Sequence, residues 1–368
     1  MVQRTDVFVI GGGPAGLAAA IAARRKGFRV VVADGAQPPI NKACGEGLLP
    51  DALAALRELG ISVRESEGYT IRGIRFLGEG AEVAAEFPKG AGVGMSRPIL
   101  HQKLVDEAAA AGVSLLWRTP VAGICAEGVK VGGGVIAAKW IIGADGIGSR
   151  VRGWIGLDTH TRHERRYAVT RHYRVKPWSD LMEVHWGKNA QAYVTPISDE
   201  RVCVALISRN AAARLVSMNG EFPRLSRSLG TAESEGGERG AITVMRRLTR
   251  VYRENVVLVG DASGSVDAIT GEGLCLGFRQ AQALADALVA GDPRQYQAAH
   301  RRLARRPALM GRLMLLLDGR TALRERAIRA LGSDARVFSR LLAAHVGAAS
   351  NTNFAATGAL LGWRLVAA

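Results

Sequence analysis

The stretch Asp6-Val7-Phe8-Val9-Ile10-Gly11-Gly12-Gly13-Pro14-Ala15-Gly16 decides the fold of this chain. Its first residues include the β-branched and aromatic types that favour a buried strand, and they run directly into a glycine cluster. The Ala-rich segment 17–26 that follows predicts a helix, and Gly27 is a helix-stop signal. Residues 28–33 form a second apolar run, which ends at Asp34. Strand, glycine turn, helix and strand in this order predict a βαβ unit.

The glycines at 11, 13 and 16 fit the spacing G-x-G-x-x-G. This spacing provides a tight turn, room for a pyrophosphate against the backbone, and close packing of helix on strand. The helix N-terminus then faces the phosphates. Asp34 stands where a carboxylate would accept hydrogen bonds from the adenosine ribose. The motif predicts a dinucleotide site without deciding between FAD and NAD(P), and the alternative is a glycine-rich turn with no ligand.

Three later segments extend the pattern. Residues 140–146 and 255–262 are each an apolar run that ends in glycine and aspartate, Gly143-Ala144-Asp145-Gly146 and Gly260-Asp261-Ala262. The segment 96–104 begins with Ser96-Arg97-Pro98 and continues as a helix-like stretch. FAD carries a diphosphate and a polyol, so it needs backbone donors at a helix end and carboxylates that accept from hydroxyls.

The order of these motifs resembles the FAD-dependent oxidoreductases of the aromatic-hydroxylase and geranylgeranyl-reductase superfamily. The resemblance implies an α/β (α+β) fold with a Rossmann-type, glutathione-reductase-like FAD-binding domain. It assigns the first motif to ADP, the middle motif to the pyrophosphate region, Asp261 to the ribityl chain and Arg97 to the flavin. The cofactor-binding residues implied in this way are Gly11, Gly13, Pro14, Ala15, Gly16, Asp34, Cys44, Gly45, Arg97, Asp145, Gly146, Gly260, Asp261, Gly271, Gly273 and Leu274.

Two segments look more like the geranylgeranyl reductases than the hydroxylases. Residues 262–274 end in Thr270-Gly271-Glu272-Gly273-Leu274, similar to the reductases' "TGEG" stretch beside the flavin ring. Lys42-Ala43-Cys44-Gly45 resembles their "K.CG" segment. The resemblance makes Cys44 a candidate proton donor or redox-sensitive thiol; the alternative is a small buried residue. Thr270 and Tyr193 are candidate substrate contacts.

One departure weakens the analogy. The reductases carry a "Y.W.FP" strand, whereas this chain reads Tyr193-Val194-Thr195-Pro196 and lacks the tryptophan. A long polyprenyl substrate is therefore in doubt. Halogenases are disfavoured because the Trp-x-Trp-x-Ile-Pro motif is absent.

The motifs at both ends of the chain require a discontinuous FAD-binding domain. Between its parts, apolar and polar residues alternate as in half-buried strands, which predicts an inserted, mostly antiparallel β-sheet substrate domain. Gly132-Gly133-Gly134 fits a hairpin turn. The expected boundaries are 1–67, 96–165 and 245–295 for the FAD-binding domain, 68–95 and 166–244 for the substrate domain, and 296–368 for a C-terminal helical region.

The chain has 368 residues and a net charge of +16. Much of that charge lies in the helix-like region from Arg294 to Arg340, where twelve arginines accompany three acidic residues. This pattern predicts peripheral contact with an anionic membrane or a carrier protein, and the alternative is a solvated arginine-rich face. Nucleic acid is not expected, since no recognition motif accompanies the charge. The four cysteines are widely spaced, which argues against a zinc cluster or a disulfide framework and favours the cytoplasm, with a possible place at the inner face of the membrane.

The leading hypothesis is an FAD-dependent reductase that adds hydride to a double bond of a hydrophobic small metabolite. The alternatives are a monooxygenase that uses a flavin C4a-hydroperoxide, and a non-catalytic flavin-binding or membrane-docking protein. No second G-x-G-x-x-G opens a helix, so NAD(P)H would bind transiently as electron donor. His172, His185 and His300 carry side chains capable of acid-base chemistry, but nothing in the sequence places them near the flavin, so they are not site candidates.

Overall fold

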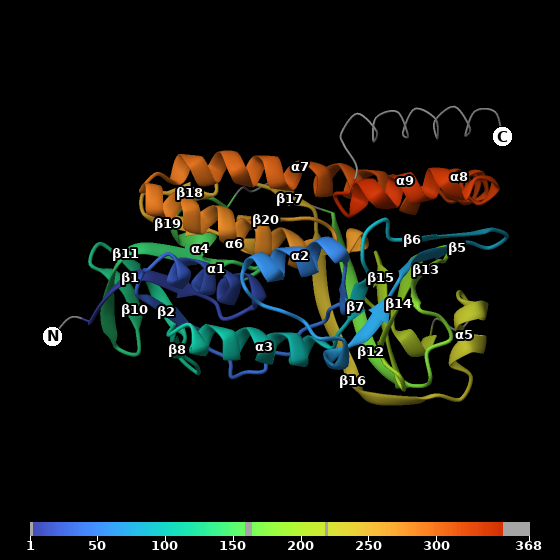
Figure 1. Ribbon diagram of the computed structural model, residues 1–368, viewed down its shortest axis with the longest axis horizontal. Coiled ribbons are helices and arrows are strands. Elements are labelled where there is room, and N and C mark those ends of the chain that lie inside the picture. Colours follow the sequence, from blue (N-terminus) through green and yellow to red (C-terminus); the bar gives the residue numbers. More distant parts are fainter. Residues whose placement is uncertain (1–2, 159–163, 218–219, 349–368) are drawn as a thin grey trace.

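The computed structural model describes residues 3–158, 164–217 and 220–348. Two large sheets stand at the two ends of the long axis, and long helices run along one side of the molecule above them (Figure 1). The first sheet contains the N-terminal motif. The second is built from the middle of the chain.

The first sheet has five parallel strands in the order β19-β11-β1-β2-β8, with β18 antiparallel at one edge. Strand β10 pairs antiparallel with β11, and β9 pairs antiparallel with β10. Its strands are β1 (Gln3–Ile10), β2 (Val30–Ala33), β8 (Ser114–Leu116), β9 (Val121–Cys125), β10 (Gly128–Val131), β11 (Gly134–Gly143), β18 (Tyr252–Arg253) and β19 (Val256–Leu258). Gly132 and Gly133 join β10 to β11 with φ angles of +54° and +81°, so the hairpin turn is confirmed.

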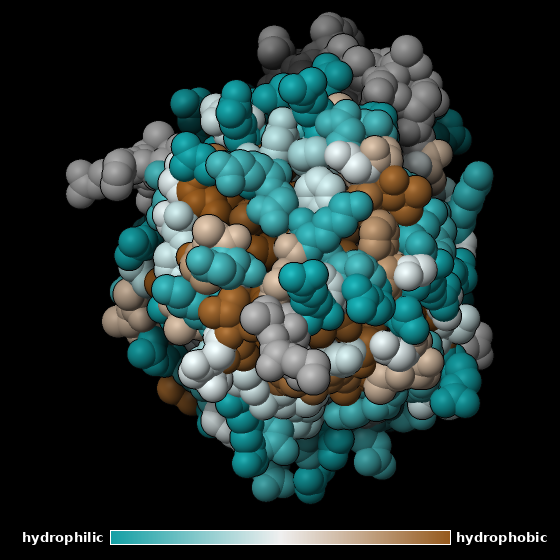
Figure 2. Space-filling model, turned by 90° about the vertical axis from the view of Figure 1, so that its left-hand side faces the viewer, coloured by the Kyte–Doolittle hydropathy of each residue, from teal (hydrophilic) through white to brown (hydrophobic). Residues whose placement is uncertain are grey.

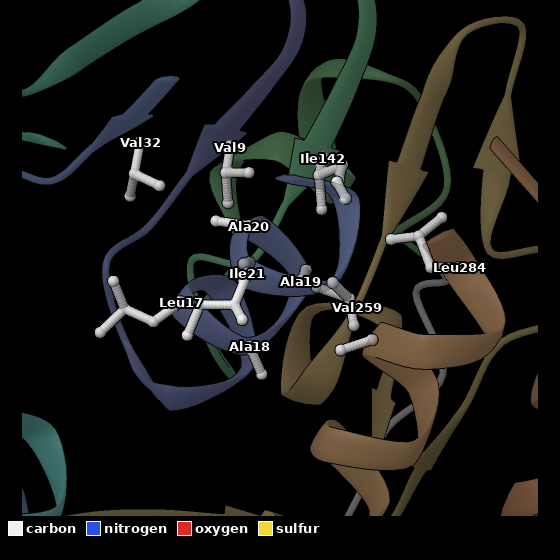
Figure 3. Close-up of a cluster of buried hydrophobic side chains, with 14 of the residues drawn as sticks. Val9, Leu17, Ala18, Ala19, Ala20, Ile21, Val32, Ile142, Val259 and Leu284 are labelled. Carbon is white, nitrogen blue, oxygen red and sulfur yellow. The ribbon is translucent and has the colours of Figure 1, made fainter. Parts of the chain in front are cut away.

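Apolar side chains on both faces of this sheet explain why helices cover it. Val9 and Ile142 are fully buried on neighbouring strands, as expected of parallel strands with helices on their faces. Helix α1 (Pro14–Arg25) packs Leu17 and Ile21 against them, and Leu284 of α6 (Gly273–Ala290) completes the cluster (Figure 3). The N-terminal and C-terminal motifs therefore share one core.

The second sheet has seven strands in the order β16-β12-β15-β14-β13-β5-β6, and its pairs are antiparallel except β13 with β5. Its strands are β5 (Gly73–Leu77), β6 (Glu82–Glu86), β12 (Arg165–Arg174), β13 (Leu181–Trp186), β14 (Ala190–Ser198), β15 (Arg201–Ser208) and β16 (Glu233–Val244). Two small sheets accompany it: β3 (Gly47–Leu48), β4 (Tyr69–Ile71) and β7 (Gly92–Gly94), and β17 (Arg246–Arg247) with β20 (Gly264–Ser265). The alternating stretch from residue 69 to 76 therefore contributes to two different sheets.

Helices connect and cover the sheets. They are α2 (Pro50–Glu58), α3 (Arg97–Ala110), α4 (Arg150–Trp154), α5 (Pro223–Leu229), α7 (Pro293–Asp318), α8 (Thr321–Ser333) and α9 (Ala335–His345). Helix α3 begins at Arg97, as the sequence predicts. Helices α8 and α9 pack on β6, so the C-terminal helices cover the second sheet (Figure 1).

The surface is mostly hydrophilic at the end of the molecule that carries the first sheet. Hydrophilic side chains separate the hydrophobic residues of this face into patches (Figure 2). Within the part of the chain that the structure describes, no helix combines the length and the apolar character needed to cross a membrane.

Candidate active site

One cavity of about 1020 Å³ connects the two sheets. It extends from the glycine loop of the first sheet to the second sheet and the C-terminal helices. With the exception of Gly16, all sequence-predicted site residues line it: Gly11, Gly13, Pro14, Ala15, Asp34, Cys44, Gly45, Arg97, Asp145, Gly146, Tyr193, Gly260, Asp261, Thr270, Gly271, Gly273 and Leu274. The volume lies at the upper end of the roughly 300–1000 Å³ usual for ligand pockets.

The three motif glycines have different physical roles. Gly11 has a φ of +111°, and a Cβ there would lie 2.5 Å from the carbonyl oxygen of Ala144. A Cβ on Gly16 would lie 2.0 Å from the carbonyl oxygen of Gly11, so Gly16 permits the helix to pack on the turn without itself facing the cavity. A Cβ on Gly13 would meet no protein atom within 4 Å. Gly13 therefore borders open space that the protein leaves for a ligand.

The loop is held by polar contacts from both sides. The carboxylate of Asp34 accepts hydrogen bonds from the backbone nitrogens of Gly12 (2.7 Å) and Ala36 (2.8 Å). His101 of α3 is fully buried, and its Nδ1 accepts from the backbone nitrogen of Ile40. Its Nε2 therefore donates to the carbonyl oxygen of Gly12 at 2.8 Å. Burial lowers the pKa of His101, which keeps the imidazole neutral in this arrangement.

The α1 end of the cavity suits an anion. Among the described residues, no side chain caps the N-terminus of α1, so its first backbone N–H groups lack side-chain partners there. The side chains of Lys42, Arg97 and Arg150 also line the cavity. The Nε atom of Arg97 is buried and has no hydrogen-bond partner among the described residues. An anionic group bound here would give these donors partners.

The two aspartates of the later motifs face different surroundings. Asp145 binds the start of α4, because its carboxylate accepts from Ser149 Oγ and from the backbone nitrogens of Arg150 and Val151. Asp261 reaches into the cavity, where desolvation raises its pKa and the charges of Arg97 and Lys42 oppose that rise. Asp261 thus lines the cavity, while Asp145 supports the loop that carries Gly146.

A short turn separates the first sheet's end of the cavity from the second sheet's end. The 3-10 helix η4 (Ala268–Thr270) is followed by Gly271 with a φ of +67° and then by α6. Tyr193 of β14 is buried, and its hydroxyl donates to the carbonyl oxygen of Ile269 at 2.8 Å. The hydroxyl of Thr270 donates to the carbonyl oxygen of Asp267. Both predicted substrate contacts therefore use their hydroxyls to hold this turn.

Sequence reasoning missed Glu46 on the cavity wall and set aside its partner His172, which does not itself line the cavity. Glu46 is buried, has a φ of +58° and lines the cavity directly after Cys44 and Gly45. Its Oε1 accepts from the backbone nitrogen of Arg97 at 2.8 Å, and its Oε2 lies 2.7 Å from Nε2 of His172 on β12. The His172 side chain keeps 21 % of its surface exposed. The pair thus extends from the cavity toward solvent.

The thiols near this pair are held by the backbone. The Sγ of Cys44 accepts from the backbone nitrogen of Glu46 at 3.4 Å. The buried Cys203 donates to the carbonyl oxygen of Cys44, and burial raises the pKa of the Cys203 thiol well above its ordinary value. Cys203 is therefore protonated at neutral pH, and Cys44 is the thiol of the two that lines the cavity.

The remainder of the cavity is mainly apolar, with Thr170, Thr243 and His345 among its polar lining residues. Strands β5, β13 and β15 of the second sheet and helices α7, α8 and α9 supply its wall. The alternation along β13 explains the lining, because Met182 and Val184 face the cavity whereas Glu183 and His185 do not line it. The apolar lining residues of these elements are Ile74, Phe76, Met182, Val184, Ala205, Ile207, Leu309, Met310, Leu313, Met314, Leu316, Leu317, Leu323, Ala327, Leu331, Phe338, Leu341 and Leu342.

The residues at the glycine-loop end fit FAD. The open space at Gly13, the unpartnered Nε of Arg97 and the carboxylates of Asp34 and Asp261 match a diphosphate flanked by a ribose and a ribityl chain. The apolar end provides room for a second molecule.

Comparison with known proteins agrees with this geometry. The model of the FAD binding domain family matches residues 4–291. The chain belongs to this family. It is an FAD-dependent oxidoreductase, and FAD is its cofactor.

Relatives in the FAD binding domain family include named reductases. The menaquinone reductase of Mycolicibacterium smegmatis is 30 % identical over 81 % of this chain and 80 % of its own length. Digeranylgeranylglycerophospholipid reductase 1 of Methanopyrus kandleri is 29 % identical over 73 % of this chain and 76 % of its own. A solved flavoprotein/dehydrogenase from Cytophaga hutchinsonii has a TM-score of 0.80, 20 % identity, and coverage of 94 % of this chain and 93 % of its own. The superfamily and fold class predicted from the motifs are thereby confirmed.

Replacing Gly13 with valine is expected to expel FAD without unfolding the protein. The new side chain would enter the space that the protein leaves open, and the φ of −72° at Gly13 is accessible to valine. We expect the Kd for FAD to rise about a hundredfold, as for a loss of roughly 3 kcal/mol of binding energy. Flavin fluorescence titration measures this. The control is Gly123→Val, another position where a Cβ meets nothing within 4 Å but which lies outside the cavity lining. Equal FAD affinity of both variants would contradict the assignment.

Stability is expected to fall in mild acid because of His300. This histidine is buried beside Ser263, with Nε2 2.9 Å from the Ser263 hydroxyl, and burial lowers its pKa to about 4. Unfolded histidine titrates near pH 6.5. Between these values the unfolded chain binds a proton that the folded chain does not, so His300 removes about 2 kcal/mol of stability between pH 7 and pH 5. Urea unfolding gives the free energy of unfolding at pH 7 and at pH 5. The difference between these two values should be smaller by this amount in His300→Gln than in the wild type. An unchanged dependence would show that His300 titrates normally.

Proposed function

We propose that this protein is a reductase that saturates a carbon–carbon double bond in a large hydrophobic metabolite. The observation that carries the proposal is the single cavity, in which the polar FAD end continues into an apolar compartment lined by the second sheet and helices α7–α9. The names of the relatives, a menaquinone reductase and a digeranylgeranylglycerophospholipid reductase, favour the same reaction class and a large apolar substrate. The missing tryptophan near Tyr193 argues against a long chain, whereas the apolar lining residues that α7–α9 contribute favour an apolar substrate.

The apolar compartment would bind and orient the substrate. Its walls are mainly aliphatic and aromatic, so binding would depend chiefly on removing apolar surface from water. Tyr193 and Thr270, whose hydroxyls are already bound to the backbone of the turn, would present that turn to the substrate as a fixed wall. Such a dry compartment also keeps water away from the reacting carbon atoms.

A proton donor is needed at the cavity wall. Bound FAD would supply the electron pair and one hydrogen to the double bond, and the second hydrogen must arrive as a proton. Glu46 is the carboxyl group that lines the cavity and is paired with a histidine on its outer side. Its carboxylic acid would give a proton to the substrate carbon, and His172 would return one from solvent through Nε2 to Oε2. Cys44, the neighbouring thiol, is the alternative donor.

The reaction is tested with reduced enzyme under anaerobic conditions. Holoenzyme reduced with dithionite is incubated with detergent-dispersed menaquinone, and separately with a phospholipid that bears geranylgeranyl chains. The products are then exposed to air, which converts quinol rings back to quinones but leaves a saturated side chain unchanged. We expect a persistent gain of two hydrogens in the mass spectrum of at least one of them. A parallel reaction under isotope-labelled oxygen tests the monooxygenase alternative, because label in the product would contradict the reductase proposal. Failure to hydrogenate either compound in the anaerobic reaction would also contradict it.

NAD(P)H is proposed as a transient electron donor. The sequence contains no second G-x-G-x-x-G that opens a helix, so the proposal gives NAD(P)H no permanent binding site. Stopped-flow measurement of FAD reduction by NADH and by NADPH tests this step separately from the reaction with substrate.

A further inference from the structure

We propose that the outward face of the C-terminal half of α7 docks on an anionic lipid bilayer. The proposal deepens the proposed function, since it adds the place from which an apolar substrate would enter. It rests on that function only in taking the substrate to be apolar. The face is defined by Leu309, Leu313 and Leu316, whose exposed fractions are 43 %, 41 % and 43 %. They rank among the most exposed large apolar side chains of the described residues.

The three leucines form one stripe. Their spacing of four and three residues places them on one side of a helix. Gly311 and Met314, which are buried, lie on the opposite side and pack toward the protein, where a Cβ on Gly311 would contact Met245 and Thr270. Helix α7 therefore has two apolar sides, and the side that carries the leucines is turned away from the packed one. An isolated exposed leucine needs no explanation, but a stripe of three does.

Arginines surround the stripe. Arg302, Arg305 and Arg312 are exposed, and at about 100° per residue each lies within roughly 60° of Leu309 around the helix axis. None of the three takes part in an ion pair that the structure describes for residues 3–158, 164–217 and 220–348. Apolar side chains flanked by free cations are the pattern of a helix that lies in the headgroup region of a membrane, with its arginines on lipid phosphates.

The stripe is continuous with the cavity. Leu309, Leu313 and Leu316 line it together with Met310 and Leu317 of the same helix. Figure 1 shows α7 along the rim of the molecule, on the far side of α6 from the first sheet. A molecule dissolved in the bilayer could therefore pass along α7 into the apolar compartment without crossing water.

Charge argues for a bilayer over a second copy of this chain. In a two-fold dimer the same patch meets itself, so Arg302, Arg305 and Arg312 would face their own counterparts. An anionic bilayer offers opposite charge and an apolar layer beneath it at the same time. A soluble carrier protein with acidic groups would satisfy the arginines, but it would leave the connection of the leucines to the cavity without a use.

The test is co-sedimentation of FAD-loaded protein with vesicles. We expect the wild type to bind vesicles of mixed phosphatidylcholine and phosphatidylglycerol at least about tenfold more tightly than vesicles of phosphatidylcholine, and less tightly as salt is raised. Two variants probe the face: Leu309→Ser with Leu313→Ser and Leu316→Ser, and Arg305→Gln with Arg312→Gln. Each should weaken binding to the anionic vesicles by about tenfold or more.

A matched control carries the same kinds of change elsewhere. Val289→Ser with Arg57→Gln alters an exposed apolar residue and an exposed arginine outside the cavity lining, and it should bind like the wild type. Flavin absorbance and the unfolding temperature of each variant show whether it is folded. Equal vesicle binding by all proteins, or binding by none, overturns the proposal. A leucine variant that changes only the oligomeric state in gel filtration also overturns it, in favour of a second copy. Because the assay needs no substrate, its outcome is independent of the anaerobic reduction test.

Discussion

Replacing Glu46 with glutamine is expected to lower kcat for anaerobic double-bond reduction by about a hundredfold or more, the usual effect of removing a positioned proton donor. Glutamine keeps the length of the side chain, and its amide oxygen can still accept from the backbone nitrogen of Arg97. The amide cannot carry the proton that His172 would pass through Oε2. The loss should therefore appear in kcat, with KM and the absorbance of bound FAD close to those of the wild type.

The chain contains a matched control for this experiment. Glu183 and His185 form a second glutamate–histidine pair, with Oε2 and Nε2 3.0 Å apart, on strand β13. Their side chains do not line the cavity, because Met182 and Val184 occupy that side of the strand. Glu183→Gln should leave kcat of the folded protein within about twofold of the wild type, since general acid catalysis requires the group to reach the substrate.

Substitutions of His172 and Cys44 distinguish between Glu46 and Cys44 as the proton donor. His172→Gln should lower kcat less than Glu46→Gln, because Glu46 can be reprotonated slowly by water that enters the cavity. Cys44→Ser should have a small effect if Glu46 is the donor. A Glu46→Gln enzyme with the wild-type kcat, together with a Cys44→Ser enzyme about a hundredfold slower, would transfer the role of proton donor to the thiol.

The first sheet and the polar part of the site could be read from the sequence because their information is local. The predicted strand 6–10 is contained in β1, and the predicted helix 17–26 overlaps α1 except at its first turn, which Pro14 begins. Gly11, Gly13 and Asp34 act through backbone geometry encoded within a few residues of each other. The local backbone conformation of such a motif follows from residues that are close in sequence, so the motif can be recognised without knowledge of the rest of the fold.

Contacts between distant segments could not be predicted in this way. Glu46 and His172 are 126 residues apart, and only tertiary packing, in which the small sheet of β3, β4 and β7 contacts β14 of the second sheet, brings them to 2.7 Å. Glu46 directly follows the segment 42–45 and stands between Gly45 and Gly47, and a charged residue between two glycines is the signal that the sequence offers. The apolar compartment also depends on tertiary packing, because α7–α9 alone give no indication that they close over β5 and β13.

Replacing Arg166 with methionine is expected to destabilise the protein by about 3–5 kcal/mol, the range for removing one partner of a buried ion pair. Arg166 of β12 is 1 % exposed, and its Nη1 donates to Asp267 Oδ1 at 2.8 Å. Its Nη2 donates to Gln191 and lies 3.6 Å from Asp318 at the end of α7. One guanidinium thus joins the second sheet, the turn before Thr270 and a C-terminal helix.

The loss should arise mainly from the charge left on Asp267. Desolvation already raises the pKa of Asp267 and Arg166 opposes that rise, so without the arginine the carboxylate would be buried with little compensation. Urea unfolding measures the change in free energy. Arg165→Met is the matched control, because the neighbouring arginine is exposed and its replacement should cost less than about 1 kcal/mol.

A double variant identifies the cause. If the unpaired charge dominates, Asp267→Asn added to Arg166→Met should recover about 1–3 kcal/mol, because the amide is buried at lower cost than a carboxylate. If lost packing dominates, the two substitutions should add. Because Asp267 also accepts from the backbone nitrogen of Ile269, whose carbonyl oxygen holds Tyr193, the same variants should alter the turn that separates the FAD end from the apolar compartment. A cost for Arg166→Met no greater than that for Arg165→Met would show that this buried network does not hold the two parts of the cavity together.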